Sequence, residues 1–242
     1  MGYARFRRPP SLPSSIRLIV ALETLILSET LASPLTLYVD AQLLSPYAMS
    51  AFVALTEKGL PVELRLVDLQ AGEQRMRPFA SRAPTCRVPA LTHDDFHLTE
   101  SSAIIEYLED VFPAPEYPSL YPSDPRQRAR TRQVQAWLRS DLAALRQDRA
   151  TDVVFHDAPA APLSDEGLAA AAKLLRVAQA LLPEGRSSLF DSWCIADTEL
   201  ALMLRRLAGD DELPAPLRAY ADAQWQRPAV QTWLQFNQDA RA

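Results

Sequence analysis

Cysteine and histidine, the side chains that most often support redox or metal chemistry, are sparse in this sequence. Its two cysteines, Cys86 and Cys194, lie 108 positions apart and form neither a CxxC pair nor a disulfide framework. His93 and His97 bracket a turn-like stretch, but no third ligand accompanies them in a zinc spacing. We therefore expect no metal site, and this cysteine usage is typical of a reducing compartment.

A serine hydroxyl is the other group placed where it could do chemistry. Ser45, Pro46 and Tyr47 stand at the expected start of a helix, where serine is a favoured N-cap and proline a favoured first residue. The N–H groups and the dipole at a helix N-terminus also stabilise an anion. On these residues alone, a capping role for Ser45 is the simpler interpretation.

Composition excludes several classes of protein. The chain has 242 residues, of which 48% are hydrophobic and 23% charged, so it is long enough and apolar enough to bury one large core or two smaller ones. Its net charge is -5, and no global basic field draws it to nucleic acid or to a membrane. Its six glycines form no phosphate-binding motif. Small molecules and proteins are the expected partners.

The elements that would position Ser45 form a βαβ unit. Residues 35–40 are rich in β-branched and aromatic side chains and predict a buried strand. Residues 47–58 predict the helix that follows Ser45, and residues 62–69 alternate apolar with polar side chains as a second strand does. A strand, helix and strand this close in sequence predict parallel strands.

A hairpin and a helix complete the first domain. Residues 70–86 are polar and irregular, residues 88–92 and 96–99 predict the hairpin, and residues 100–112 predict the helix. The order βαβ, irregular helix, ββα is that of a thioredoxin-like domain with a mixed four-stranded sheet. We assign residues 34–112 to this α/β domain.

Five prolines between residues 113 and 125 predict a linker. Beyond it, strand-like alternation is absent and the pattern is helical. We expect five helices, over residues 126–149, 164–182, 195–208, 214–224 and 228–238. Residues 126–242 therefore form an all-helical domain.

The first 33 residues resemble a signal peptide only at first sight. Arg17, Glu23 and Glu29 interrupt the apolar stretch, which is then too short for secretion and for spanning a bilayer. We expect residues 1–33 to be a dispensable extension of a cytoplasmic protein whose folded part begins near Pro34.

From Pro34 to Gln238 the sequence resembles a glutathione S-transferase. Four segments carry the resemblance: Ser45-Pro46-Tyr47, Arg87-Val88-Pro89, Glu100-Ser101-Ser102-Ala103-Ile104 and Cys194-Ile195-Ala196-Asp197-Thr198. Residues 135–141 and 151–155 are similar to the bacterial YfcF-like branch of that superfamily. The resemblance implies a thioredoxin-like domain followed by a helical domain, with glutathione as co-substrate and no metal.

In a serine-type member of this family, Ser45 would activate glutathione. A free thiol, with a pKa of about 8.5, is mostly protonated at neutral pH. A hydroxyl that donates to sulfur, together with the helix N-terminus, would stabilise the thiolate and lower the pKa. The resemblance thus implies that Ser45 is a hydrogen-bond donor and not a base.

The resemblance also implies a binding role for four residues and a structural role for a fifth. Pro89 matches a cis-proline, which leaves the Val88 backbone free to pair with the cysteinyl part of glutathione. Ser101 matches the residue that holds the γ-glutamyl carboxylate, and Glu100 the residue that holds its ammonium group. Arg87 would bind the glycyl carboxylate, or it is an ordinary solvated arginine.

Asp197 matches a buried motif at the start of a helix in the second domain, where it would accept a hydrogen bond from the Cys194 backbone N–H. Cysteine is a weak cap, so the reciprocal side-chain bond is in question. Cys86 precedes the Arg87 segment and is open to thiol-disulfide exchange, although an incidental cysteine is the simpler interpretation.

These residues predict a glutathione transferase that joins glutathione to a small hydrophobic electrophile or uses it to reduce a peroxide. The alternative is a non-catalytic binding or regulatory protein that has kept the fold, because fold does not fix function. The resemblance further implies a homodimer, in which the first domain of one subunit meets the helical domain of the other.

Overall fold

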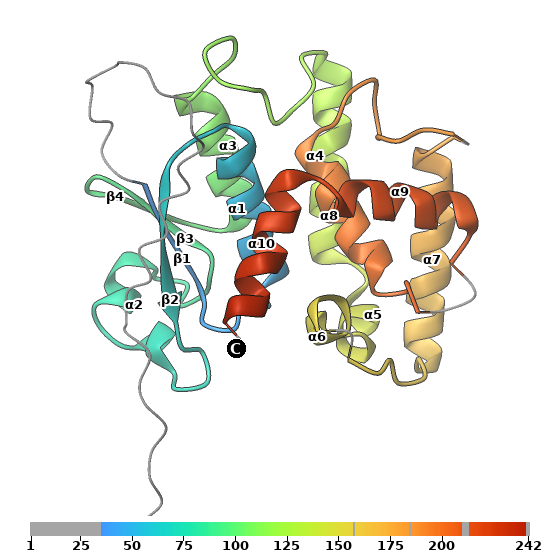
Figure 1. Ribbon diagram of the computed structural model, residues 1–242, viewed down its shortest axis with the longest axis horizontal. Helices are drawn as coiled ribbons and strands as arrows, with labels where there is room; N and C mark the ends of the chain where they lie inside the picture. Colours follow the sequence, from blue (N-terminus) through green and yellow to red (C-terminus); the bar gives the residue numbers. More distant parts are fainter. Residues whose placement is uncertain (1–34, 157, 184, 210–212, 241–242) are drawn as a thin grey trace, which may run out of the picture.

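The computed structural model describes residues 35–156, 158–183, 185–209 and 213–240. A part containing the β-sheet lies beside a part built of helices, at the left and right of Figure 1. The expected extension, residues 1–33, lies outside the described residues. In the described ranges, no helix is both long and apolar enough to cross a membrane.

The first part is a thioredoxin-like domain, as predicted. Its sheet contains four strands, β1 (Leu35–Asp40), β2 (Val62–Val67), β3 (Ala90–His93) and β4 (Phe96–Thr99). Their order is β2-β1-β3-β4; β1 and β2 are parallel, and the other two pairs are antiparallel. The parallel pair follows from the βαβ unit and the last antiparallel pair from the hairpin.

Helices cover both faces of this sheet. They are α1 (Pro46–Glu57), the short η1 (Glu73–Arg75) and α2 (Phe79–Arg82), and α3 (Ser101–Val111). Leu37 and Val39 pack on the face that α1 and α3 cover, whereas Tyr38 points to the other face and meets the Phe79 ring edge-on at 5.6 Å. The alternation along β1 thus supplies both layers of the core.

The second part is helical, as predicted. It contains α4 (Pro125–Ser140), α5 (Ala143–Asp148), α6 (Thr151–Phe155), α7 (Asp165–Leu181), α8 (Ile195–Arg205), α9 (Ala215–Trp225) and α10 (Pro228–Asp239). Helix α8 packs against α4 and α9 and also reaches α1, so it is the central helix of this part (Figure 1). The last helix, α10, returns to pack on α1.

Two expectations for the helical part are wrong. The single helix expected over residues 126–149 is broken into α4 and α5, because Leu142 adopts a left-handed backbone with φ of 61°. The Arg146 side chain then turns back and donates to the carbonyl of Leu138, at the end of α4. The short α6 was missing from the expected helices, because its five residues are too few to show a helical period.

One hydrophobic core runs through both parts. The fully buried Phe52 of α1 lies 5.4 Å from the Trp233 ring of α10. Polar contacts join the same surfaces: Arg227 pairs with Glu57 at 2.8 Å, and the Asn237 amide donates to the carbonyl of Leu43 at 3.2 Å. The helical part is therefore fixed relative to the first helix of the sheet part.

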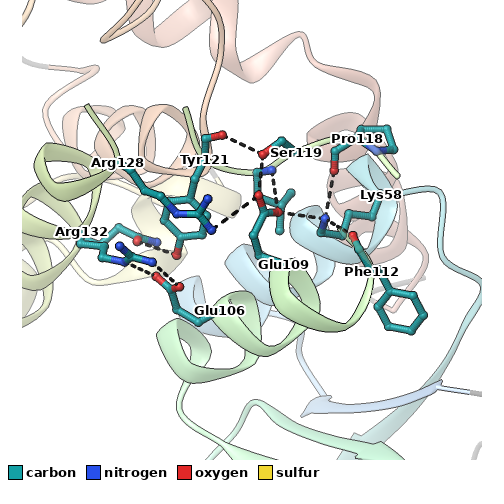
Figure 2. Close-up of polar contacts among 11 residues, drawn as sticks. Lys58, Glu106, Glu109, Phe112, Pro118, Ser119, Tyr121, Arg128 and Arg132 are labelled. Atoms are coloured by element: carbon teal, nitrogen blue, oxygen red, sulfur yellow. Dashed lines mark hydrogen bonds and ion pairs between the residues drawn. The ribbon is translucent and has the colours of Figure 1, made fainter. Parts of the chain in front are cut away.

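A buried ion pair fastens the linker to the first part (Figure 2). The Lys58 Nζ, at the end of α1, lies 2.9 Å from a Glu109 carboxylate oxygen of α3. It also donates to the carbonyls of Phe112 and Pro118, at 2.8 and 3.0 Å, so all three of its donors are used. Glu109 in turn accepts the Leu120 backbone N–H at 3.0 Å. Because both ends of the pair hold linker backbone, the pair determines how the chain enters α4.

Lys58→Met should lower the free energy of unfolding by about 3–5 kcal/mol, because Glu109 stays buried and its one remaining cation among the described residues is the more distant Arg128, at 3.9 Å. Urea denaturation measures this loss. Lys173→Met, which removes the exposed Lys173–Asp141 pair, is the control. It should lower the free energy of unfolding by less than about 1 kcal/mol.

The same pair makes stability depend on acid pH. Burial would raise the pKa of Glu109, but hydrogen bonds from Leu120, Ser119 and Lys58 outweigh burial and hold this pKa below its ordinary value. A carboxylate with a lowered pKa adds stability above the pKa of the unfolded state, about 4.3, and loses that contribution as pH falls. The difference in unfolding free energy between wild type and Lys58→Met should therefore become smaller below about pH 4. A difference that stays the same there would contradict the role of the Lys58–Glu109 pair.

Candidate active site

A pocket of about 170 Å³ lies where β3 and α3 begin. Seven residues line it: Tyr47, Arg87, Val88, Pro89, Glu100, Ser101 and Arg139. The four residues expected to bind glutathione are all among them, together with Pro89. The structure thus brings into one pocket residues from four separate segments of the sequence.

The end of β1 positions Ser45. One carboxylate oxygen of Asp40 accepts the backbone N–H of Ser45 at 2.9 Å, and the other accepts that of Leu44 at 2.7 Å. The Ser45 hydroxyl oxygen accepts the Ala48 N–H at 3.2 Å, so Ser45 is the N-cap of α1. A hydroxyl that accepts one bond can still donate its hydrogen, and among the described residues no acceptor takes it. Capping and donation to a bound thiol are therefore compatible.

Ser45 itself is not among the residues that line the pocket, whereas Tyr47, two positions further along, is. Ser45 is half-buried at the loop between β1 and α1. The structure therefore places the candidate activating residue at the helix end beside the pocket.

The segment before β3 forms one wall. The Val88–Pro89 peptide bond is cis, as the resemblance implies. Val88 precedes β3 and lies outside its strand pairing, which begins at Ala90. Its backbone is therefore available to an extended ligand. Arg87 is exposed and has no ion-pair partner among the described residues.

Glu100 forms the opposite wall in a strained conformation. Its φ of 72° and ψ of 112° are outside the regions that residues with a side chain ordinarily occupy. Ser101, the first residue of α3, is buried, and no side chain caps this helix among the described residues. The free N–H groups of this first turn can therefore bind a carboxylate.

Arg139 of α4 is the site residue that sequence reasoning missed. Its guanidinium donates to the Ser101 hydroxyl at 3.0 Å, and it makes two bonds to the Glu199 carboxylate of α8, at 2.6 and 2.7 Å. It also lies over the Tyr47 ring, 5.6 Å from the centroid. No local pattern indicates this role, because these partners are distant in sequence.

Glu199 is held on several sides. Its carboxylate accepts from the Ser50 hydroxyl of α1 and from the Gln135 amide of α4, the latter at 3.1 Å. Burial would lower the pKa of Arg139, but the Glu199 carboxylate outweighs burial and raises it. Arg139 is therefore a fixed positive charge beside Ser101.

The sequence matches family models for the glutathione S-transferase N-terminal domain over residues 44–111 and C-terminal domain over residues 124–239. Human glutathione S-transferase theta-1 is 34% identical over 206 residues, which cover 83% of this chain and 81% of that protein. The chain belongs to the glutathione S-transferase family.

Solved structures of other glutathione transferases agree with this assignment. A glutathione transferase homologue from Burkholderia gl BGR1, with bound glutathione, has a TM-score of 0.70 and 43% identity and covers 86% of this chain and 99% of its own. The apo form of human glutathione S-transferase T1-1 has a TM-score of 0.60 and 28% identity, over 86% of this chain and 90% of its own.

The family motif at Asp197 lies away from the pocket, inside the helical part. The Asp197 carboxylate accepts the backbone N–H groups of Cys194 and Leu189, at 2.8 and 2.7 Å, and the Tyr220 hydroxyl at 2.8 Å. The Cys194 N–H bond is the one expected from sequence. Burial raises the pKa of the Cys194 thiol, so this thiol is poorly reactive.

Cys86 and the two hairpin histidines contribute little to this site. Cys86 is half-buried, has a left-handed backbone with φ of 51°, and is not a lining residue of the pocket. His93 bonds to the Tyr107 hydroxyl at 2.8 Å and His97 to Thr92 at 3.0 Å. Within the described ranges, no three metal-ligating side chains lie together.

Arg139→Met should lower the free energy of unfolding by about 3 kcal/mol, because the Glu199 side chain, only 8% exposed, then stays without its cation. Arg139→Met/Glu199→Gln should be more stable than Arg139→Met alone, since no unpaired charge remains. Chemical denaturation of the single and double variants measures both effects.

Arg132→Met is the matched control on the same helix, because it removes the exposed Arg132–Glu106 pair. This substitution should lower the free energy of unfolding by less than about 1 kcal/mol. If Arg139→Met lowers the free energy of unfolding as little as Arg132→Met does, the Arg139–Glu199 pair is not structurally important.

Proposed function

We propose that this protein is a serine-type glutathione transferase that activates the glutathione thiolate for attack on an electrophile. The observation that carries the proposal is the pocket shared by Arg87, Val88, Glu100 and Ser101, beside the helix that Ser45 caps. The branch within the family, expected to be YfcF-like, stays a prediction.

The pocket offers a complementary group for each part of the tripeptide. The γ-glutamyl carboxylate would meet the start of α3, the Ser101 hydroxyl and the Arg139 guanidinium. The exposed Glu100 would hold the ammonium group, and the Val88 backbone would pair with the cysteinyl residue. Arg87 makes no ion pair with the described residues and would bind the glycyl carboxylate.

The proposed reaction depends on bound glutathione being in its thiolate form. Ser45 donates its free hydroxyl hydrogen to sulfur, and the N-terminal end of α1 adds its positive dipole. The sulfur lone pair then forms a bond to an electrophilic carbon while the leaving group departs with its bonding electrons. With a peroxide, sulfur attacks one oxygen to form a sulfenic acid while the O–O bond breaks and the other oxygen leaves as an alcohol. A second glutathione thiol then forms the disulfide, and water is released.

A non-catalytic glutathione-binding protein is the alternative. Retention on immobilised glutathione without turnover of any electrophile or hydroperoxide would favour it. Thiol exchange through Cys86 would instead require an activity that Cys86→Ser abolishes. The free cysteines agree with the cytoplasmic location included in this proposal.

Ser45→Ala should lower turnover of 1-chloro-2,4-dinitrobenzene at neutral pH by at least about tenfold, because one hydrogen bond to a charged group contributes about 1.5–3 kcal/mol. The Michaelis constant for glutathione should change much less, since the pocket residues hold the peptide. Raising the pH should restore part of the rate, so the two pH–rate profiles are the measurement.

Ser164→Ala is the matched control for capping. Ser164 caps α7 through Gly167 at 3.0 Å, and its loss should cost about 1 kcal/mol of stability without changing turnover. Coinciding pH–rate profiles for wild type and Ser45→Ala would mean that Ser45 is only a cap.

We also propose a homodimer in which the first domain of one subunit meets the helical domain of the other. Phe96 on β4 and Val111 on α3, both in the first domain, are each 43% exposed, and these apolar side chains support an interface there. The mass measured by sedimentation should be twice that of the subunit. Phe96→Glu should lower this mass toward that of the monomer. A wild-type monomer at micromolar concentration would contradict the dimer.

A further inference from the structure

A second pocket adjoins the candidate glutathione pocket. Its lining comes from α1, α4, α5 and α8, with Arg206 just beyond the end of α8. Tyr47 and Arg139 line both pockets, so the two are neighbours across these side chains. The second pocket holds about 30 Å³, roughly twice the space that one water needs. This space suits a single small group at the end of a larger ligand.

Cations outnumber anions in this lining. Arg139, Arg146 and Arg206 contribute three positive charges, whereas Glu199 is the only carboxylate among the lining residues. Glu199 already pairs with Arg139 through two hydrogen bonds. Two positive charges are therefore left without a carboxylate in the pocket.

The two remaining arginines bond to neutral backbone carbonyls. Arg146 donates to the carbonyls of Leu138, at 2.9 Å, and Asp141, and Arg206 donates to the carbonyl of Arg149. A carbonyl oxygen orients a guanidinium but does not neutralise its charge. Asp152 is the further carboxylate that acts on Arg206, and it is exposed on α6, outside the pocket lining.

Arg206 is the unusual member of this group. Its residue surface is only 3% exposed, and its Nε has no hydrogen-bond partner among the residues that the structure describes. Burial, and next the positive charge of Arg146, lower the pKa of Arg206 to about 10. It is still charged at neutral pH, and a buried charge of this kind is costly unless an anion pairs with it.

We propose that the second pocket binds the anionic group of the electrophile, so that the second substrate is an apolar electrophile carrying a carboxylate or sulfonate. The anion would lie against Arg206 and Arg146, and the apolar body would extend past Pro46 and Tyr47 toward the glutathione pocket. Leu202 and Met203 supply apolar contacts beside the charged group. This inference rests on the proposed transferase function and refines the small hydrophobic electrophile expected from sequence.

A matched pair of benzyl bromides tests the proposal: 4-(bromomethyl)benzoate and its methyl ester. In both, glutathione sulfur forms a bond to the benzylic carbon and bromide leaves. After correction for the uncatalysed rates, wild-type protein should show kcat/KM at least about tenfold higher for the carboxylate, as expected for a charge-assisted hydrogen bond. Equal values, or a preference for the ester, would overturn the proposal.

Arg206→Met should remove the preference by lowering kcat/KM for the carboxylate about tenfold and leaving the ester within about twofold. Arg205→Met is the control, because the neighbouring Arg205 carries the same charge but pairs with Asp222 and does not line this pocket. It should keep the preference. Loss of the preference in Arg205→Met alone would contradict a site at Arg206.

A measurement on the wild-type protein covers the case in which Arg206→Met fails to fold. 4-Toluenesulfonate should be a competitive inhibitor of methyl ester turnover. Its inhibition constant should be at least about tenfold lower than that of the neutral 4-toluenesulfonamide. Equal inhibition by the two compounds would overturn the proposal. Absence of conjugation with both bromides would instead contradict the transferase function, so the two failures are distinct.

Discussion

The ion pair between Arg139 and Glu199 is the interaction on which the candidate site depends. It joins α4 to α8 with two short hydrogen bonds, and each partner also reaches the first domain, Arg139 through Ser101 and Glu199 through Ser50. A largely buried charge pair is stable only if its remaining donors and acceptors are satisfied, and here Ser50 and Ser101 of the first domain, together with Gln135 of α4, satisfy them. The domain interface and the pocket are therefore one structure.

This constraint explains where the two pockets lie. Tyr47 and Arg139 separate them, because the guanidinium rests over the phenol ring. One pocket presents the start of α3, an exposed glutamate and a backbone edge, which are groups that recognise a peptide. The other presents two arginines with no carboxylate partner in the pocket, beside apolar side chains, and we propose that this combination recognises an amphipathic anion. A thiolate near α1 would be close to both.

Sequence could predict the parts that depend on local interactions. The cap at Ser45, the parallel β1–β2 pair and the hairpin each follow from residues within a short span. The break at Leu142 was not predictable, since a left-handed leucine is imposed by packing and not by propensity. Arg139 was missed for a related reason: its partners are 38 and 60 residues away, so only the folded chain brings them together.

The central claim is that the start of α1 stabilises the thiolate of bound glutathione. Ultraviolet difference absorbance of the thiolate, recorded across pH with glutathione bound to the wild-type protein, measures it most directly. The account predicts a thiol pKa at least about one unit below that of a free thiol, which is about 8.5. A bound thiol that titrates together with free glutathione would contradict the account.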